Sequence, residues 1–320
     1  MKAWMHFAAL AALTSFTAHA DDTVRLGNLK FAHYGAVSYM KDVCPKYGIH
    51  IEERVFAKGL DIVPAMMAGD IDISASAMEA AISGRAAGVP NYIVAGFANG
   101  GANIISRADL KLKTIADLKG KRVGLPRGGP QEILLLAELT KAHLTWSEKG
   151  DKDVTIVYMG YPDLNQALQT KNLDAISQSE PYAAQAINKG FATEIIKPYD
   201  TELGRPIRAL VMTEKLYNNR PLAARVVKCF VDSTKQFLAD PKFAEKYVRD
   251  TMFKGQVSAE DYRDAMDNVS FSYDIDAAHV QHTTDYMKQF GIGKLQNPPA
   301  ARDWVKTDLL DAAKKELGVK

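Results

Sequence analysis

The segment LPRGGPQEILL, which begins at position 125, contains residue types that could bind an anion. After a predicted strand, Arg127, Gly128 and Gly129 form a turn, and Pro130 and Gln131 begin a predicted helix. Such a turn exposes backbone N–H groups at the positive end of a helix dipole, where anions are stabilised. Arg127 could add a bidentate contact to a carboxylate or sulfonate, or could simply face solvent. The segment is not a nucleotide P-loop, because no Gly-Lys-Ser or Gly-Lys-Thr follows the glycines.

Two clusters of polar residues follow other predicted strands. They consist of Ser76, Met78 and Glu79, and of Gln178, Glu180 and Tyr182. Ligands of open α/β sheets bind beyond the carboxyl ends of the strands, so both clusters are candidate ligand contacts. Met78 fits the core as well as a ligand site, and Glu180 could instead cap the helix that follows. Glu79 could accept an N–H from a ligand or pair with Arg127.

Aromatic and amide residues near further strand ends complete the candidate ligand site. They are Phe31, His33, Tyr34, Asn99 and Tyr161. Aromatic faces suit a ring or an alkyl chain of a ligand, although Phe31 could equally belong to the core. Arg208 could reach an acidic ligand group, but a structural salt bridge is the preferred interpretation there.

No catalytic or cofactor signature is present in the sequence. Gly-x-Ser-x-Gly, His-Glu-x-x-His and Gly-x-Gly-x-x-Gly are all missing, so we expect no catalytic residue and no cofactor, although catalytic triads are geometric rather than sequential. His279 and His282 lie one helical turn apart near Asp285, a spacing that can bind a metal ion. No third ligand signature accompanies them, so we expect a solvated helix face and no metal.

Strands alternate with helices through most of the chain, which indicates an α/β fold with a largely parallel sheet. The predicted strands are 23–29, 49–55, 71–74, 121–125, 154–159 and 173–177. Residues 61–81 and 163–184 share the order helix, turn, strand, small polar cluster and helix, which suggests two lobes that close on one ligand. From Arg220 onward the chain is mostly helical, with a predicted helix over 300–317.

The N-terminus has the pattern of a secretory signal peptide. A positive start precedes an apolar run that is too short to span a bilayer, and Ala18-His19-Ala20 has the form of a cleavage site. We expect cleavage after Ala20 and export to the periplasm. The formal charge of +2 falls to +1, because the cleaved segment holds one lysine and no acid, and this balance does not favour nucleic-acid binding. Cys44 and Cys229 could form a disulfide in that compartment or remain two buried thiols.

Four segments together resemble a known protein family. They are Gly69-Asp70-Ile71-Asp72-Ile73, the segment IADLKGKRVG at 115–124, Gly128-Gly129-Pro130 and Ser179-Glu180-Pro181-Tyr182. In this order, behind a signal peptide, they make the chain similar to the periplasmic substrate-binding proteins of ABC importers in the nitrate/sulfonate/taurine (NitT/TauT) group.

The resemblance implies a bilobal α/β fold of the periplasmic-binding-protein type (type II), in which two lobes with mainly parallel sheets are joined by two hinge crossings. We expect a signal peptide over 1–20, lobe I over 21–107 and 207–320, and lobe II over 108–206. The crossings are expected near 106–109 and 205–209. Both cysteines would then lie in lobe I, which favours a disulfide.

The same resemblance implies the solute-binding component of an ABC importer. We expect a monomer that binds a small anionic organic solute between its lobes, either a sulfonate or a carboxylate, with aromatic acids among the candidates. It would deliver this solute to a permease and its ATPase at the inner membrane. Three alternatives stay open: an exported enzyme that uses His33, Glu79 or Glu180 as acid and base, a binding protein for a pyrimidine-type vitamin precursor, and a sensor-type binding domain.

Overall fold

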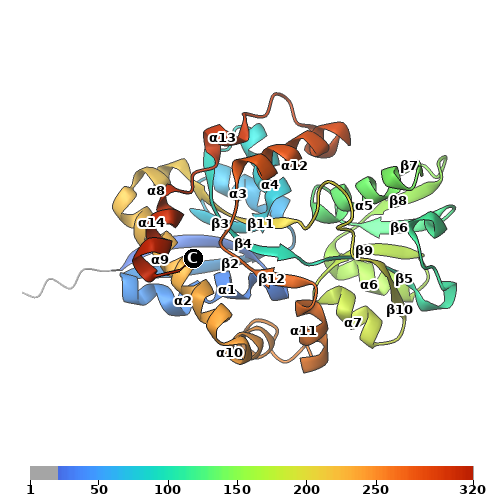
Figure 1. Cartoon of the computed structure of the whole chain (residues 1–320), viewed down its shortest axis with the longest axis horizontal. Coiled ribbons are helices and arrows are strands. Elements are labelled where there is room, and N and C mark those ends of the chain that lie inside the picture. The colour runs from blue at the N-terminus through green and yellow to red at the C-terminus, as the bar shows by residue number, and fades with distance from the viewer. Residues whose placement is uncertain (1–20, 320) are drawn as a thin grey trace, which may run out of the picture.

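Two α/β lobes, each built on one sheet, form the described part of the chain (Figure 1). This computed structural model describes residues 21–319, so the predicted signal peptide, residues 1–20, lies outside the described residues. Within that range, no helix is both long enough and apolar enough to cross a membrane. The bilobal α/β prediction is confirmed.

The first lobe contains a sheet with the strand order β12-β4-β11-β3-β1-β2. Its strands are β1 (Asp22–Leu29), β2 (Ile49–Phe56), β3 (Ile73–Ala77), β4 (Asn91–Gly100), β11 (Ile207–Thr213) and β12 (Val269–Phe271). β3 reads Ile-Ser-Ala-Ser-Ala and is buried along its whole length, which is typical of a central strand that other elements cover on both faces.

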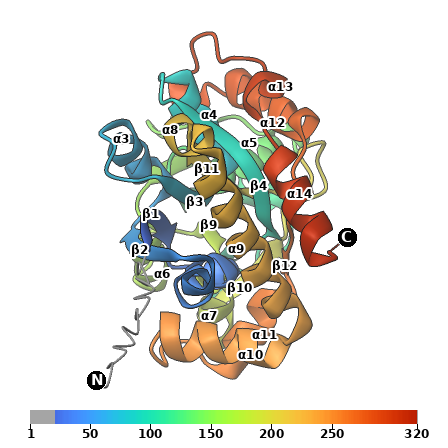
Figure 2. The same cartoon turned by 90° about the vertical axis from the view of Figure 1, so that its left-hand side faces the viewer.

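Helices cover both faces of this first sheet. They are α1 (Gly35–Ser38), α2 (Met40–Val43), α3 (Ile62–Met67), α4 (Met78–Ala86), α8 (Glu214–Asn218), α9 (Arg220–Ala239), α10 (Pro241–Lys246), α11 (Ala259–Met266), α12 (Ala277–Gln289), α13 (Ala301–Trp304) and α14 (Asp308–Leu317). The long helix α9 packs against α1, α2 and α14 (Figure 2), whereas α4 packs against α12. The last predicted helix, 300–317, is divided into α13 and α14, because Val305 between them forms a bridge with Ile93 of β4.

The second lobe contains a sheet with the strand order β10-β5-β9-β6-β8-β7. Its strands are β5 (Ala102–Arg107), β6 (Arg122–Leu125), β7 (Trp146–Ser147), β8 (Val154–Tyr158), β9 (Ala175–Ser179) and β10 (Ala192–Ile196). The helices around it are α5 (Pro130–Lys141), α6 (Tyr161–Gln169) and α7 (Tyr182–Asn188). In Figure 1, α5 lies above this sheet, and α6 and α7 lie below it.

Both sheets are mixed: two of the five strand pairings are parallel in the first sheet, and three of the five are parallel in the second. β1, β2 and β3 run parallel to one another, whereas β11 is antiparallel to β3 and to β4. In the second sheet, β5 is antiparallel to β9 and β10. The parallel strands point their carboxyl ends toward the other lobe. A strand that enters a lobe from the other lobe must therefore run in the opposite direction, which is what β5 and β11 do.

The first crossing between the lobes lies earlier than predicted. β4 belongs to the first sheet and β5 to the second, so the chain passes between them at Gly100 and Gly101 rather than near 106–109. Both glycines have positive φ values, 86° and 80°, which L-residues with a side chain rarely adopt. The sequence marks this point with Asn99-Gly100-Gly101 between two apolar runs, but the prediction placed the crossing at the polar residues that follow the second run. The chain returns through residues 197–206 to β11.

Cys44 and Cys229 form a disulfide bond within the first lobe. The bond joins the turn that follows α2 to the middle of α9, and it connects residues that are 185 positions apart in the sequence. Of the two alternatives that the sequence left open, the structure shows the disulfide.

Candidate ligand-binding site

The candidate site is a narrow pocket between the two lobes, at the carboxyl ends of β1, β3, β6 and β9. Seven of the predicted residues line it: Phe31, Tyr34, Arg127, Gly128, Gly129, Pro130 and Tyr161. Leu60, Ser179 and Arg208 also line it. The open space is about 20 Å³, which is room for roughly one water molecule. The lobes are therefore closed, and an organic solute can enter only if they separate.

Arg208 is the most unusual residue of this pocket, because its guanidinium is buried without an acidic partner. The residue is 2% exposed and lies in β11, between β3 and β4. Its Nε donates to Nε2 of His33 at 3.2 Å, while its Nη1 has no partner. Among residues 21–319, no carboxylate lies within 4.0 Å of its nitrogens. The predicted structural salt bridge is therefore wrong, and Arg208 keeps a buried charge that no carboxylate contacts directly, an arrangement that is costly.

His33 is neutral in this environment. Burial, and secondly the charge of Arg208, hold the pKa of His33 well below its usual value. Because Nε2 accepts the hydrogen bond from Arg208, the single ring proton must reside on Nδ1. The buried Nδ1 has no partner. It is therefore a hydrogen-bond donor that a ligand could use.

Glu79 adds a buried acidic group next to Arg208. It is 2% exposed, and its Oε2 has no hydrogen-bond partner. Burial raises the pKa of Glu79 to about 7, although the charge of Arg208 opposes this rise. At neutral pH the carboxyl group can therefore exist in both protonation states, and it can either accept or donate a hydrogen bond.

The Arg127 turn lies where the sequence predicted it, but its side chain has other partners. Arg127 Nη2 donates to Glu148 at 2.8 Å, and the guanidinium lies 3.6 Å from the ring centroid of Tyr158. The side chain is 56% exposed. One turn amide is also occupied, because Gly128 N donates to Glu132. The turn lines the pocket, whereas the Arg127 charge is already paired within its own lobe.

Aromatic rings and Gln131 form the remainder of the contact between the lobes. The ring of Phe31 meets Tyr161 edge-on at 4.9 Å, which joins the two lobes. The Tyr161 hydroxyl donates to Oε1 of Gln131. Nε2 of the buried Gln131 has no partner and is a further donor beside the start of α5.

Nine of the predicted residues do not line the pocket, and three of them, His33, Glu79 and Gln131, are buried polar residues near its lining. Met78 is 1% exposed and belongs to the hydrophobic core, as its alternative interpretation proposed. Ser76 borders a separate small cavity behind β3, and Asn99 lies in β4 outside the pocket. Gln178 helps to position Tyr161, because its Nε2 donates to the backbone oxygen of Tyr161 at 3.3 Å.

Glu180 and Tyr182 lie on the hinge side rather than in the pocket. The Glu180 carboxylate accepts from Ala184 N at 3.1 Å and from Asn268 Nδ2 at 3.2 Å. It thus caps the start of α7, as the alternative interpretation proposed, and it also bonds to the first lobe. Burial raises the pKa of Glu180 to about 7. The Tyr182 hydroxyl donates to the Lys30 oxygen at 3.4 Å across the lobes.

The sequence analysis preferred a structural salt bridge for Arg208 over a ligand contact, and few features of the sequence pointed to its place in the pocket. The sequence places Arg208 just after the second crossing, but only the tertiary structure shows that no carboxylate of the described residues lies within 4.0 Å of its nitrogens. The structure also shows the surroundings of His279 and His282, the pair with metal-binding spacing. His282 Nε2 lies 3.1 Å from the backbone oxygen of Glu202. Within the described residues, no three His, Cys, Asp or Glu side chains gather in an arrangement that could hold a metal ion.

The fold is that of a two-lobed protein with a pocket between its lobes, and the buried Arg208 lines this pocket. The chain belongs to the NMT1-like family, whose model matches residues 18–251. A protein of Brachyspira hyodysenteriae, named as an ABC transporter periplasmic binding protein, is 25% identical over 69% of this chain and 67% of its own. The matches to Brucella binding proteins cover only 41% of those proteins.

Solved structures confirm the periplasmic-binding-protein fold. The alkanesulfonate-binding protein SsuA from Xanthomonas axonopodis pv. citri, bound to MOPS, is 18% identical with a TM-score of 0.75 over 91% of this chain and all of that chain. The periplasmic nitrate-binding protein NrtA from Synechocystis PCC 6803 is 16% identical with a TM-score of 0.75 over 94% of this chain and 90% of that chain. The family resemblance inferred from the sequence is therefore confirmed.

Proposed function

We propose that this protein binds a small organic anion, a sulfonate or a carboxylate, between its two lobes and delivers it to an ABC importer. The buried guanidinium of Arg208, which has an unpaired Nη1 and no acidic partner in the described residues, is the observation that carries this proposal. An anionic ligand would supply the missing countercharge. The start of α5 adds a favourable dipole from the opposite lobe.

Other buried polar groups without hydrogen-bond partners indicate which features the rest of the ligand should have. His33 Nδ1 and Gln131 Nε2 are donors that suit further ligand oxygens. Glu79 suits a ligand N–H or O–H group. The rings of Phe31 and Tyr161 suit an apolar portion, either a ring or a short alkyl chain. The preferred ligand is thus an organic acid with one hydrogen-bond donor.

Binding is coupled to movement of the lobes in this proposal. A pocket of about 20 Å³ cannot admit such a ligand in the closed form, so the open form must bind it first. The ligand then favours closure, because Arg208 and the Gly128 turn can contact it from two lobes only when they approach each other. The names of the relatives support an importer permease as the partner and the periplasm as the location.

A ligand screen by thermal shift tests the proposal. Alkanesulfonates, aromatic sulfonates, aromatic carboxylates and nitrate are each compared with a neutral isostere, such as a sulfone or an amide. A true ligand at a hundred times its Kd should stabilise the protein by about 2.7 kcal/mol. The proposal fails if only neutral or cationic compounds raise the melting temperature.

A catalytic function is the second candidate, and the carboxyl of Glu79 favours it. A buried acid with a pKa of about 7 beside a neutral histidine is an arrangement that enzymes use for proton transfer. Mass spectrometry of each stabilising compound after long incubation with the protein distinguishes the two functions. An unchanged compound supports binding alone, whereas a stoichiometric excess of product would support the enzyme.

A further inference from the structure

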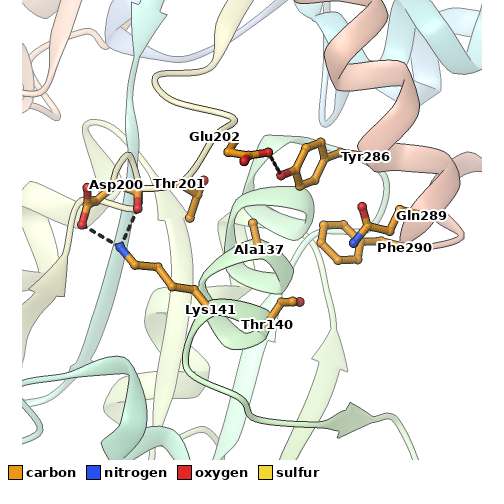
Figure 3. Close-up of a pocket in the computed structure, with 9 residues that line it drawn as sticks. All are labelled: Ala137, Thr140, Lys141, Asp200, Thr201, Glu202, Tyr286, Gln289 and Phe290. Atoms are coloured by element: carbon orange, nitrogen blue, oxygen red, sulfur yellow. Dashed lines mark hydrogen bonds and ion pairs between the residues drawn. The ribbon is translucent and has the colours of Figure 1, made fainter.

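A second and much larger pocket lies away from the ligand site, where α5, α12 and the returning hinge segment meet (Figure 3). Its volume is about 540 Å³, which falls within the range of small-molecule sites. The last turn of α5 supplies one wall, and the end of α12 supplies the opposite wall. The segment 200–202 closes the pocket between them. No residue predicted for the ligand site lies here.

The wall on α12 is aromatic. Tyr286 and Phe290 have ring centroids 5.8 Å apart. Trp146 of the second lobe meets the ring of Phe290 edge-on at 6.0 Å, so the aromatic group continues across the lobes. In Figure 3, the rings of Tyr286 and Phe290 extend from α12 toward α5. Aromatic faces are electron-rich and attract cations.

Three charged residues line the pocket beside these rings, and one of them, Glu202, has no ion-pair partner among the described residues. Lys141 Nζ pairs with Asp200 at 2.6 Å, so those two charges cancel. Glu202 accepts a hydrogen bond from the Tyr286 hydroxyl at 2.8 Å. In the described part of the chain, it forms no ion pair within 4.0 Å. With one lysine and two acids, the charged lining residues sum to −1.

We propose that this pocket binds a small organic ammonium compound. The cationic head would lie against the rings of Tyr286 and Phe290 and beside the Glu202 carboxylate, which supplies its countercharge. The hydroxyls of Thr140 and Thr201 and the amide of Gln289 line the rest of the pocket and suit a polar tail. Oγ1 of Thr201 is buried and has no partner, so it is available to such a tail.

The site would differ from the cleft in the sign of the charge that it selects. The cleft contains a buried guanidinium and favours an anion, whereas this pocket contains the solvent-exposed carboxylate of Glu202 beside aromatic faces and favours a cation. Its walls come from both lobes, so an occupant would also respond to their relative position. The inference does not depend on the proposed transport function.

Choline and 3,3-dimethylbutan-1-ol form the decisive probe pair, because they have nearly the same shape and only choline is charged. Binding is measured by titration calorimetry without any organic anion present, so a failure of the cleft proposal leaves this test unaffected. Choline should bind at least about tenfold more tightly than the neutral alcohol. Equal binding of the two compounds, or no binding of either, overturns the proposal.

Two variants and one matched control locate the site. Glu202→Gln keeps the shape of the side chain and removes its charge, and Phe290→Leu removes a ring face. Each should weaken choline binding by about tenfold or more. Asp285→Asn removes a charge from the same helix outside the pocket, and it should leave binding unchanged. Full choline affinity in Glu202→Gln would refute the assignment, and melting temperatures of all variants show whether each one is folded.

Discussion

Two arginines border the ligand pocket, and their surroundings give them opposite roles. Arg127 is 56% exposed, and Glu148 and the Tyr158 ring already stabilise its charge. Arg208 is 2% exposed, and among residues 21–319 its only side-chain hydrogen bond goes to the neutral His33. An arginine that already has an acidic partner gains less from an anionic ligand than an arginine that has none. Arg208 is therefore the residue on which ligand affinity should depend.

Replacement of Arg208 by methionine should abolish most of the anion affinity without unfolding the protein. Loss of one partner of a buried charge pair costs about 2–5 kcal/mol, which is a weakening of roughly thirtyfold or more. The ligand-free protein should be as stable as the wild type or more stable, since an unpaired buried charge is removed. Titration calorimetry with the best ligand of the screen, together with urea denaturation, measures both effects.

Arg127→Met is the matched control for this prediction. It removes the same functional group from the same pocket, but it should change the affinity by less than about 1 kcal/mol because that arginine is largely exposed and already paired. If Arg127→Met weakens binding as much as Arg208→Met, then the difference in pairing does not determine the anion contact.

At the scale of elements, the turn between β6 and α5 determines how closely the lobes can approach. Gly128 has a φ of 78°, and a Cβ built there would lie 2.4 Å from Cδ1 of Leu60 in the opposite lobe. Gly129 has a φ of −133°, which any residue adopts, and the nearest atom to its Cβ would be 3.7 Å away. The two adjacent glycines therefore have different structural requirements.

Gly128→Ala should hinder closure, whereas Gly129→Ala should not. The added methyl group of the first variant strains the turn and collides with Leu60, so the closed form is destabilised relative to the open form. The strain of the turn is common to both forms, so the change in affinity comes from the contact with Leu60, and a fall of up to about tenfold is expected because overpacking costs on the order of 1–3 kcal/mol. Small-angle scattering with and without ligand should show a smaller contraction for Gly128→Ala only. An equal effect of both variants would contradict this role of the turn.

Another element-scale prediction concerns Glu180, which joins the start of α7 to Asn268 of the first lobe. Its pKa is about 7 in the folded protein, above the value of about 4.3 expected for an unfolded chain. The folded state therefore holds the proton more tightly. This contribution to stability is complete below pH 4, is lost as the pH rises through about 7, and is absent above it.

Glu180→Gln should therefore flatten the dependence of stability on pH. The free energy of unfolding of the wild type should fall between pH 5 and pH 8 by on the order of 2–3 kcal/mol from this group. The variant should lose that part of the slope and keep the part due to Glu79, whose pKa is raised in the same direction. Urea denaturation at both pH values measures the slopes. Identical slopes would show that Glu180 does not titrate in this range.

At the scale of the whole molecule, the two lobes are stabilised differently. The first lobe carries the only disulfide of the described chain and consists of two segments that are distant in sequence. The second lobe is one continuous segment without a cross-link. Ligand binding requires the lobes to move relative to each other, and the disulfide, which joins two parts of the first lobe, does not restrain that movement.

Removal of the disulfide should lower stability and leave ligand affinity unchanged. Cys44 and Cys229 are 185 positions apart, and cross-links that close long loops contribute about 2–5 kcal/mol. The double variant Cys44→Ala/Cys229→Ala should show this loss in chemical denaturation, as should the reduced wild type. A large drop in affinity for the organic anion would contradict the separation of the disulfide from the cleft.

Much of the fold could be predicted because its signals are local. The alternation of strands and helices follows from hydrophobic periodicity, glycines and prolines, and the six predicted strands lie within a few residues of β1, β2, β3, β6, β8 and β9. The strands β4, β5 and β7 have no predicted counterpart. The crossing at Gly100–Gly101 was placed too late, because a pair of glycines between two apolar runs is equally typical of a turn within one sheet. The break at Val305 was also missed, because its cause is a partner strand far away in the sequence.

The sequence by itself determined the class of fold and the place of the site, because strand ends and a glycine turn before a helix are properties of neighbouring residues. Only the tertiary structure decided which charges face each other. It left Arg208 without an acid, paired Arg127 with Glu148 and placed Glu180 at the hinge. These outcomes depend on distances between segments from different lobes, and the energy of a buried charge depends on everything that surrounds it.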